Sequence, residues 1–452
     1  MANTYLTRSI SSGSDLTKWT WSCWVKRTDL VGVGNNYQRL ISNEHSGDNN
    51  KAWYIRFQSS TQFHGWVQNS AFEFTTNGKY RDVNGWLHLV VKYDSTQSTQ
   101  SNRLKVYVNG EEPSMSAITY PSQNQVCNFM NSNVGYVDIG YYRQGSSEYF
   151  HGLMSHMHFT AGYAYDASAF GETDATTGEW KIKINPSVTY GSLGFFILKD
   201  GNSVTDQSGN GNNFTVGGGT LTKTEDCPSN VFCTLSPLHK LGTNTGTYSN
   251  GNTKLTDANG NWQGTMCTLG ATSGKYYWEY QLVAGTYHMI GVMPDNVNLI
   301  SSSVFDTIGG YSAYIDNGYL EARYNNADIS GWSKSDLGNT TFSTNDYINI
   351  AVDMDNKFMY IGKNGTWLKS GDPTSGSSGT GGINISATFT NGVFMIPVIS
   401  AYNGTTGQFN FGNGYMGTTA VSSAGTNASG NGIFEYDVPT GYTALSTKGL
   451  NL

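Results

Sequence analysis

Apolar and polar residues alternate with a period of two along most of this chain. In the segment "RLKVYVNG", Leu104, Val106 and Val108 fall on one face and the residues between them on the other. The segment "YINIAVDMD" repeats the pattern from Ile348 to Met354. Successive side chains of a strand point to opposite faces of a sheet, so this period predicts β-strands with one buried face.

Tight turns separate the predicted strands. Asn-Gly and Asp-Gly pairs tolerate the positive φ of two-residue hairpin turns. Such pairs begin at 77, 84, 109, 200, 250, 259, 317, 364, 391 and 403. Helical periodicity is hard to find, and short strands at about ten-residue spacing are typical of β-sandwiches. We therefore predict an all-β chain built from two tandem antiparallel β-sandwiches.

The strand pattern breaks once, near the middle of the chain. The stretch "DQSGNGNNFTVGGGT" (206–220) ends the first half, and "KTEDCPSNVFCTLSPLHK" (223–240) follows with two prolines and no alternation. A length of 452 residues also exceeds what one ordinary core accommodates. We predict a first domain over 1–222, a linker over 223–240 and a second domain over 241–452.

Composition narrows the classes of partner. Charged residues make up 13% of the chain, against a usual share of about 25%. The net charge of -7 and the lack of a Lys/Arg stripe argue against nucleic-acid binding. No window approaches eighteen consecutive apolar residues, and no secretory signal is visible, so we expect no membrane insertion. The five cysteines lack a CxxC pair and are expected to be buried free thiols.

Catalytic motifs are not evident. Glycoside hydrolysis needs two carboxylates about 5–9 Å apart. The motifs "DMD" (353–355) and "EYD" (435–437) place acids at alternate positions, and neither has a third acid nearby. No GxSxG, HExxH or phosphate-binding loop occurs. We predict a protein that is not an enzyme and that uses no cofactor.

Two groups of residues in the first half have metal-ligand character. "HGLMSHMHF" places His156 and His158 within chelating reach, but a third and a fourth zinc ligand are not apparent, so we predict no metal site there. "DQSGNGNN" offers oxygen atoms from Asp206, Asn210 and Asn212. It lacks the several carboxylates of a tight calcium loop, and both calcium binding and a Gly-rich hairpin remain open.

A third group lies in "GYYRQGSSEYF", and its members are candidate ligand-binding residues: Tyr141, Tyr142, Arg143 and Tyr149. Aromatic rings near a loop are able to stack on the faces of sugars. The side chains of Arg143 and Glu148 are able to bond sugar hydroxyls. Half-buried core tyrosines are the alternative interpretation.

A series of motifs follows in order from Tyr5: "YLTRSI", "KWTWSCWVKR", "WYIRF", "GWLHLVVKYD…RLKVYVNG" and "YFHGLMSHMHFTAGYAYDASAFGE". The series resembles the LamG family of concanavalin-like jelly rolls, in a variant common in structural proteins of tailed phages, especially marine phages. "YGSLGFFILKDGNSVTDQSGNGNNFTV" (190–216) and "EDCPSN" (225–230) extend the resemblance over nearly all of 1–235. The resemblance implies a LamG-like jelly-roll domain in a virion protein.

A second series is similar to the SPRY domain: "GKYYWEYQL" (274–282), "MIGVMPD" (289–295), "YSAYIDNGYL" (311–320) and "NDYINIAVDMDNKFMYIGKNGTW" (345–367). "FMIPVISAYNGTTGQFNFGN" (394–413) and "YDVPTGYTALST" (436–447) match the end of phage-borne SPRY proteins. The resemblance covers about 245–450 and implies a two-sheet sandwich that binds peptides or proteins through loops at one end. The candidate residues are Tyr311, Tyr314 and Trp332, the last because its neighbours in "DISGWSKSD" are polar.

These features together predict a phage virion structural protein of the tail-fibre or head-fibre type, an adhesin with a face that binds host-surface glycans. A purely structural decoration or tail-scaffold protein is the first alternative, and a polysaccharide depolymerase is the second. The expected partners are other virion proteins and a host cell-surface glycan or protein. By analogy with other phage fibres we expect a homo-oligomer, a trimer, on the virion exterior after synthesis in the host cytoplasm.

Overall fold

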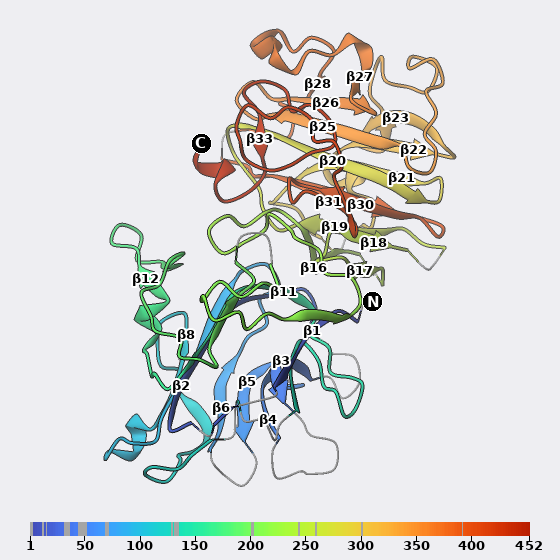
Figure 1. The fold of residues 1–452 in the computed structure, drawn as a ribbon. Coiled ribbons are helices and arrows are strands. Elements are labelled where there is room, and N and C mark those ends of the chain that lie inside the picture. Colours follow the sequence, from blue (N-terminus) through green and yellow to red (C-terminus); the bar gives the residue numbers. More distant parts are fainter. Residues whose placement is uncertain are drawn as a thin grey trace. The chain divides into compact units, whose positions relative to one another are not determined.

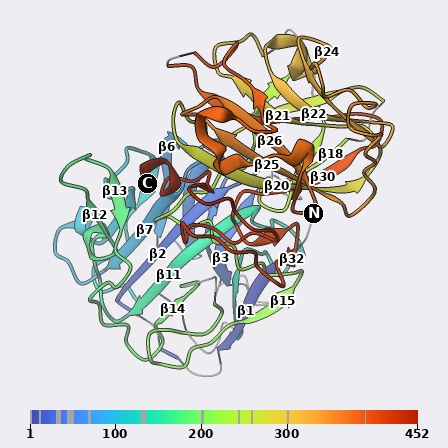
Figure 2. The same cartoon turned by 90° about the horizontal axis from the view of Figure 1, so that it is seen from above.

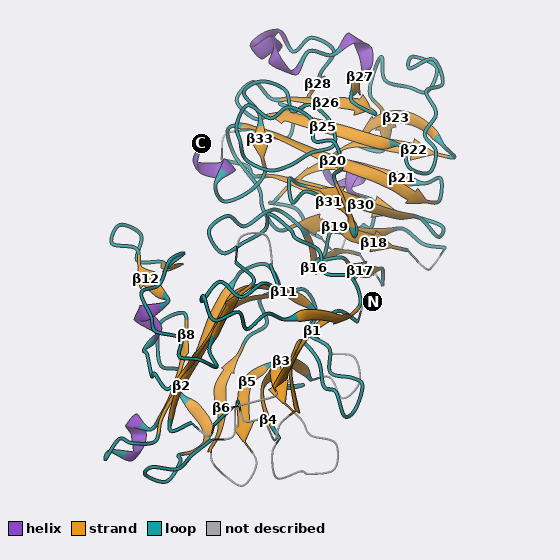
Figure 3. Cartoon of the chain, in the orientation of Figure 1, coloured by secondary structure: helices purple, strands orange, loops and turns teal. Residues whose placement is uncertain are grey.

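The structure is a computed structural model that describes residues 3–10, 13–14, 16–30, 37–43, 52–67, 72–127, 130, 135–199, 203–242, 245–257, 260–299, 302–390 and 392–452. The chain divides into two compact units, 1–223 and 224–452. Strands predominate in both units, and the helices are short 3-10 turns (Figures 1 and 3). The predicted all-β class with two antiparallel sandwiches is confirmed.

The first unit contains two large antiparallel sheets. Over the described residues, the eight-stranded sheet has the order β15 (Thr215–Gly218), β1 (Tyr5–Ile10), β10 (Gly135–Ile139), β3 (Gln38–Asn43), β4 (Trp53–Phe57), β5 (Gln62–Val67), β6 (Phe72–Lys79) and β9 (Met115–Thr119). The five-stranded sheet has the order β14 (Phe195–Ile197), β11 (Gly152–Ala161), β2 (Lys18–Arg27), β7 (Leu87–Asp94) and β8 (Leu104–Val108). A hairpin of β12 (Gly171–Thr173) and β13 (Trp180–Ile182) and two turns, η3 (Gln100–Asn102) and η5 (Ala167–Ala169), complete the unit.

The period-two pattern of β2 places Trp19 and Trp21 on one face of the strand and Trp24 on the other. Trp19 and Trp21 are fully buried in the core between the two sheets. Trp24 belongs to the other face, where its ring stacks on His88 of β7 with 4.7 Å between centroids. Figure 2 shows β11, β2 and β7 side by side, as their pairing requires. This central part of the sheet is therefore packed on both faces.

The second unit also pairs two large sheets. Its seven-stranded sheet has the order β16 (Leu235–Leu241), β19 (Gln263–Cys267), β29 (Met395–Ala401), β21 (His288–Pro294), β22 (Tyr311–Asp316), β23 (Tyr319–Tyr324) and β24 (Ala327–Asp328). The other sheet has the order β17 (Thr247–Ser249), β18 (Lys254–Thr256), β30 (Thr406–Asn410), β20 (Lys275–Ala284), β25 (Tyr347–Asp353), β26 (Phe358–Lys363) and β27 (Thr366–Trp367), with β28 (Ile383–Asn384) on β26 and β33 (Thr443–Ala444) parallel to β20. The remaining elements are β31 (Tyr415–Met416), β32 (Thr419–Ala420), η6 (Phe305–Ile308), η7 (Leu368–Ser370), η8 (Pro373–Ser378) and η9 (Gly449–Asn451).

The C-terminal segment covers the outer face of the sheet that contains β20. Phe434 and Tyr442 of this segment pack with Tyr277 of β20 in a separate apolar cluster. The buried carboxylate of Glu279, also on β20, accepts backbone N–H bonds from residues 435 and 436 at 3.0 and 2.8 Å. The segment is thus held both by apolar packing and by a buried polar anchor.

Turns form at five of the predicted Asn-Gly pairs; four of them close hairpins, and the one at 403–404 joins β29 to β30 of the other sheet. Both residues have positive φ at 109–110, 250–251, 317–318, 364–365 and 403–404. The turn predicted at 77 is wrong, because Asn77 lies inside β6 and its N–H bonds the carbonyl of Ser114. The pair at 84 forms a bend without positive φ before β7. The pairs beginning at 200, 259 and 391 begin outside the described residues.

The segment predicted to be a linker, 223–240, joins the second unit from residue 224 on. Phe232 and Cys233 are buried, and β16 begins at Leu235. The exact boundaries of the predicted domains, at 222 and 240, stay predictions.

All five cysteines are free thiols, and Cys227 is half-buried whereas the other four are buried. In the described part of the chain, no helix has the length and hydrophobicity that a membrane crossing requires.

Candidate functional site

A crevice of about 640 Å³ opens in the first unit beside β1. It is lined by Thr7, Arg8, Ser9, Ile10, Tyr136, Ser192, Leu193, Gly211, Asn212, Asn213 and Thr215. These residues come from β1, from β10 and from two segments near the end of the unit, 192–193 and 211–215. Amide, hydroxyl, guanidinium and aromatic groups therefore share one concave surface.

The crevice exists because the pairing of β1 with β15 stops early. The ladder between these strands pairs Leu6 with Val216 and Thr7 with Thr215, and β15 begins at Thr215. Beyond Thr7, strand β1 keeps its partner β10 on one side only. Its edge from Arg8 to Ile10 faces the crevice instead of another strand.

The loop from 206 to 213 forms one wall, and Asp206 organises it. One carboxylate oxygen of Asp206 accepts the N–H groups of Phe196 and Ser208 at 2.8 and 2.9 Å. The other accepts the Ser208 hydroxyl and the N–H of Asn212, both at 2.8 Å. These four donors engage the carboxylate of the sequence-predicted oxygen cluster and give it a structural role in the loop.

The amides of this loop are tied to the neighbouring turn. The Asn210 Nδ2 group donates to the carbonyls of Gly191 and Gly194, and the Asn212 Nδ2 group donates to those of Ser192 and Gly194. The segment thus forms a hydrogen-bonded loop that connects β14 to β15 of the other sheet, and it is not the Gly-rich hairpin that the sequence offered as one alternative.

Arg8 supplies the charge of the crevice wall. Its Nη2 group donates to the Oδ1 atom of Asn212, while its buried Nη1 group has no hydrogen-bond partner among the described residues. Burial lowers the pKa of Arg8, and the nearby charge of Asp206 acts in the opposite direction. A guanidinium stays ionised under such a shift, so Arg8 is a cation at neutral pH.

Tyr136 forms the aromatic part of the wall and is 45% exposed. The guanidinium of Arg143 lies 4.2 Å from the centre of its ring. Arg143 also donates to both carboxylate oxygens of Asp138, at 2.7 and 2.6 Å, and to the Thr7 hydroxyl at 2.7 Å. The predicted residue Arg143 therefore positions two lining residues, Tyr136 and Thr7.

The other aromatic candidates of this loop lie behind the wall or away from it. Tyr141 and Tyr149 are buried and pack on Tyr5, with 4.2 and 6.4 Å between ring centroids. Tyr142 is half-buried and lies over the guanidinium of Arg39 at 4.5 Å. The alternative reading of half-buried tyrosines thus describes these three residues better than an exposed platform.

The candidates of the second unit are core residues. Tyr311 stacks on Tyr324 at 4.2 Å and is buried. Tyr314 is buried beside Trp262. Trp332 is 6% exposed and belongs to the main core, which corrects the expectation of an exposed ring among polar neighbours. The structure does not bring these three together at a surface.

His156 and His158 each lie within hydrogen-bond distance of a neighbouring hydroxyl group. Strand β11 is irregular between Ser155 and His158, and His156 has a positive φ of 48°. The Nδ1 atom of His156 lies 2.8 Å from the Ser155 hydroxyl, and that of His158 lies 2.9 Å from the Tyr190 hydroxyl. No group of three or more His, Cys, Asp or Glu side chains with metal-binding geometry occurs in the described residues.

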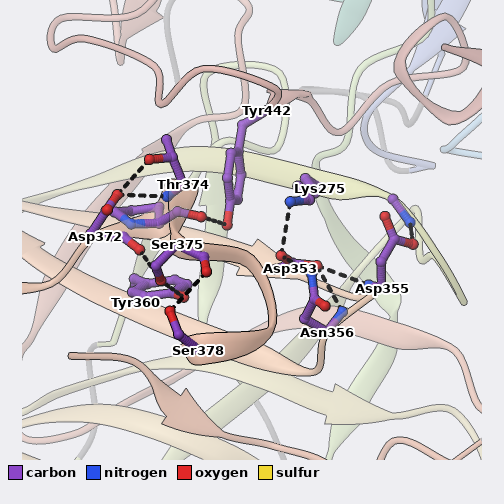
Figure 4. A network of polar contacts seen from close by, with 12 residues as sticks. Lys275, Asp353, Asp355, Asn356, Tyr360, Asp372, Thr374, Ser375, Ser378 and Tyr442 are labelled. Carbon is purple, nitrogen blue, oxygen red and sulfur yellow. Dashed lines mark hydrogen bonds and ion pairs between the residues drawn. The ribbon is translucent and has the colours of Figure 1, made fainter. Parts of the chain in front are cut away.

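The acidic pairs singled out by the sequence are used in turns. The carboxylate of Asp353 is paired with Lys275 and bonded to Asn356 (Figure 4). The Asp353–Lys275 distance is 3.0 Å, and Asp355 accepts the N–H of Gly274. Asp437 of the "EYD" motif accepts hydrogen bonds from the N–H and the hydroxyl of Thr426. Neither motif presents two free carboxylates side by side.

Sequence reasoning missed Tyr136, Arg8 and Asn213. The segment "GYVDI" (135–139) carries the available signal, because Tyr136 alternates with the core residues Val137 and Ile139. Arg8, by contrast, shares its strand face with the core residues Leu6 and Ile10 and pairs with Val137 of β10. Neither sequence pattern reveals that β1 and the segment 211–215, about 200 positions apart, line the same crevice.

One protein-family model matches part of the first unit. The model of the concanavalin A-like lectin/glucanases superfamily matches residues 2–168, which include β1 and β10 but not the loop from 206 to 213. The predicted LamG/concanavalin-like character of this region is thereby supported. No sequence among curated proteins matches the chain.

Solved structures that are similar to parts of the chain share little sequence with it. The SPRY domain of human HERC1 is 19% identical, with 39% of this chain and 96% of that domain covered and a TM-score of 0.26. The TRIM65 PSpry domain is 12% identical, with 39% and 91% covered and a TM-score of 0.29. A candidate carbohydrate-binding protein from Bacteroides ovatus is 15% identical, with 40% and 55% covered and a TM-score of 0.27. At these TM-scores the likenesses carry no further conclusion.

Proposed function

We propose that the chain binds carbohydrate through the crevice beside β1. The observation that carries the proposal is one concave surface lined by an exposed ring, Tyr136, and by the polar residues Ser9, Asn212 and Asn213 beside Arg8. Sugars offer an apolar ring face for stacking and hydroxyls that both donate and accept hydrogen bonds. A few polar groups around an aromatic wall are the usual composition of a small-ligand site.

The proposed setting is the exterior of a phage particle, as a fibre or adhesin that touches host-surface glycans or proteins. This setting rests on the ordered motifs of both halves and not on the crevice. Each contact in the crevice is weak and neutral, apart from Arg8. Useful affinity would then come from many copies on one particle, through effective concentration.

The ring of Tyr136 provides the test. We expect Tyr136→Ala to weaken glycan binding about tenfold, because an exposed ring in a binding patch contributes about 1–2 kcal/mol. The measurement is a glycan array with the full chain displayed multivalently, followed by titration of each hit in solution.

Tyr163→Ala is the matched control, since Tyr163 is 43% exposed in the same unit but does not line the crevice. Its binding should equal that of the unsubstituted chain. The proposal fails if no glycan binds at high multivalency, or if both substitutions weaken binding equally.

The two alternatives make different predictions. A decoration or tail-scaffold protein would bind virion partners and leave glycans unbound. A depolymerase would shorten host capsule or lipopolysaccharide chains during incubation. The carboxylates of Asp353 and Asp437 are engaged by Lys275 and Thr426, which favours a binding protein over a depolymerase.

A further inference from the structure

Three half-buried aromatic residues meet at one end of the seven-stranded sheet of the second unit. Trp262 comes directly before β19, Tyr402 directly after β29 and Tyr287 directly before β21. The rings of Trp262 and Tyr402 lie nearly parallel, with 5.3 Å between centroids and 27° between planes. The rings of Tyr287 and Tyr402 meet edge-on, at 5.4 Å and 84°. These three residues are named the aromatic row.

The strand register places the aromatic row on the outer face of the sheet. Strand β29 lies between β19 and β21, and its last residue, Ala401, pairs with Gln263 on one side and with His288 on the other. Ala401 belongs to the core between the two sheets, and His288 is fully buried. Successive side chains of a strand point to opposite faces, so the next position on each strand, which the row occupies, points away from that core.

Each ring of the aromatic row carries a polar group that the chain leaves unused. Within the described residues, neither the indole N–H of Trp262 nor the hydroxyl groups of Tyr287 and Tyr402 form a hydrogen bond. An indole N–H is a donor only, and a phenol is able to donate. The flanking turns are exposed and uncharged: 260–261, 284–286 and 403–404. The row therefore presents hydrogen-bond donors on an aromatic surface with neutral surroundings.

Two common modes of recognition do not fit the aromatic row. Strands β19, β29 and β21 each have a neighbour on both sides, so the backbone offers no free edge to a peptide that adds a strand. A sugar ring stacks on an open aromatic face, but Tyr402 is flanked by Trp262 on one side and by Tyr287 on the other. The middle of the row thus presents a ring edge and a hydroxyl group.

The spacing of the donors matches a polyproline II helix. Neighbouring strands lie about 4.8 Å apart, so Trp262 and Tyr287, two strands apart, are separated by roughly 10 Å. One turn of a polyproline II helix, three residues with a rise of about 3.1 Å each, spans about 9.3 Å. This helix has no internal hydrogen bonds, so its carbonyl groups are free acceptors, and proline has no N–H that would need a partner.

We propose that the aromatic row binds a proline-rich segment of another protein in the polyproline II conformation. Its carbonyl groups would accept the N–H of Trp262 and the hydroxyl of Tyr287 one turn apart, while proline rings pack against the ring edges. Asp316, opposite Tyr287 on β22, is ion-paired with Lys334, so this pair adds no net charge beside the row. The inference concerns the second unit and does not depend on carbohydrate binding at the crevice of the first.

Three probes test the class of ligand: decaproline, a flexible Gly-Ser peptide of the same length, and cellohexaose, a neutral linear sugar. Calorimetric titration of the full chain should show at least tenfold tighter binding of decaproline than of the Gly-Ser peptide, because a preformed helix loses less conformational entropy. Added salt should leave the binding of decaproline unchanged, since no charge takes part in it.

Phe substitutions remove the donors and keep an aromatic ring. Trp262→Phe and Tyr287→Phe should each weaken decaproline binding about two- to tenfold, the contribution of one neutral hydrogen bond. Tyr287→Phe keeps the whole ring, so it stays informative even if Trp262→Phe disturbs packing. Tyr436→Phe is the matched control, since Tyr436 is a half-buried tyrosine of the same unit that contacts Tyr347 of the other sheet. This control should change nothing.

Each outcome supports the inference or overturns it. Decaproline binding that the row variants weaken and that Tyr436→Phe leaves unchanged supports it. Equal binding of decaproline and the Gly-Ser peptide, or no binding of either, would overturn it, as would decaproline binding that survives in both row variants. Cellohexaose binding that the row variants weaken would assign the row to sugars instead. The crevice is tested separately by Tyr136→Ala.

Discussion

Burial separates the aromatic residues of this chain into those that pack and those that are available for contact. Trp332 is 6% exposed within the core of the second unit, whereas Tyr319 is 40% exposed on β23. Tyr136 and Tyr163 are similarly open in the first unit. A buried ring contributes to the free energy of folding and has no free face to offer a ligand.

Truncation of these two rings in the second unit should therefore have unequal effects. We expect Trp332→Ala to lower the free energy of unfolding by about 3–5 kcal/mol, the usual cost of deleting a buried Trp. Tyr319→Ala should lower it by less than about 1 kcal/mol. Chemical denaturation of the full chain, followed by fluorescence, measures both. A stable Trp332→Ala protein would contradict the burial of this ring.

The sequence predicted some of the site residues and not others, for a physical reason. Arg143 and Asn212 lie in stretches whose composition marks them as polar loops, and both contribute to the crevice or its support. Tyr136 and Arg8 lie in ordinary strands. Both line the crevice only because residues 211–215, far away along the chain, fold against β1, where β15 leaves the strand edge unpaired. Exposure of a ring such as Trp332 also depends on distant packing, which local polarity does not reveal.

Among the elements, the turn that follows β8 shows how a turn and a packed face depend on each other. Asn109 and Gly110 have φ of 48° and 84°, as a two-residue hairpin turn requires. The Oδ1 atom of Asn109 accepts the N–H of His88 at 2.8 Å. A Cβ atom on Gly110 would lie 2.5 Å from the ring of Trp180 on β13.

A pair of glycine substitutions separates backbone strain from this steric contact. Gly110→Ala should cost about 1 kcal/mol for its positive φ and a further 1–3 kcal/mol for overlap with Trp180. Gly162→Ala should cost only the first part, because Gly162 has φ of 85° and a Cβ atom there meets nothing within 4 Å. The difference in unfolding free energy between the two variants isolates the contact. Equal losses would contradict the packing of Trp180 over the turn.

Alternation of apolar and polar residues predicted individual strands correctly. The alternation in "RLKVYVNG" and "YINIAVDMD" corresponds to β8 and β25. The Asn-Gly pair at 77 was wrongly predicted to be a turn, because β6 continues through it and pairs with the segment before β9. Both residues of such a pair favour a turn locally, but a neighbouring strand that offers a carbonyl keeps the backbone extended.

Across the whole molecule, buried titratable groups are distributed unevenly between the two units. In the first unit, burial lowers the pKa of His64 to about 4, that of His88 to about 3 and that of His158 well below its usual value. In the second unit, burial lowers the pKa of His288 to about 4 but raises that of Glu279 to about 7.

The two units should therefore respond differently to acid. A histidine with a lowered folded pKa destabilises the fold as the pH falls below about 6.5, by up to about 1.4 kcal/mol per pH unit. Three such groups act together in the first unit. In the second unit Glu279 keeps its proton in the folded state, so its contribution to stability grows as the pH falls from about 7 towards 4.5, and it offsets His288.

Hydrogen exchange on the full chain, read peptide by peptide between pH 7 and pH 5, tests this difference. After correction for the intrinsic exchange rate, peptides of 1–223 should lose protection while those of 224–452 change little. Glu279→Gln removes the offset and should make the second unit acid-sensitive through His288. A parallel loss in both units of the unsubstituted chain would contradict the assignment.

The pairing of Tyr5 with Gly218 joins the first and last strands of the eight-stranded sheet. During translation at roughly 5–20 residues per second, β1 waits about 10–40 s for β15 to emerge from the ribosome. Such a long-range closure is slow to nucleate and leaves an open sheet edge on the nascent chain in the meantime. The crevice, whose walls come from both ends of this unit, is completed last, so ligand binding would report that synthesis of the whole unit has finished.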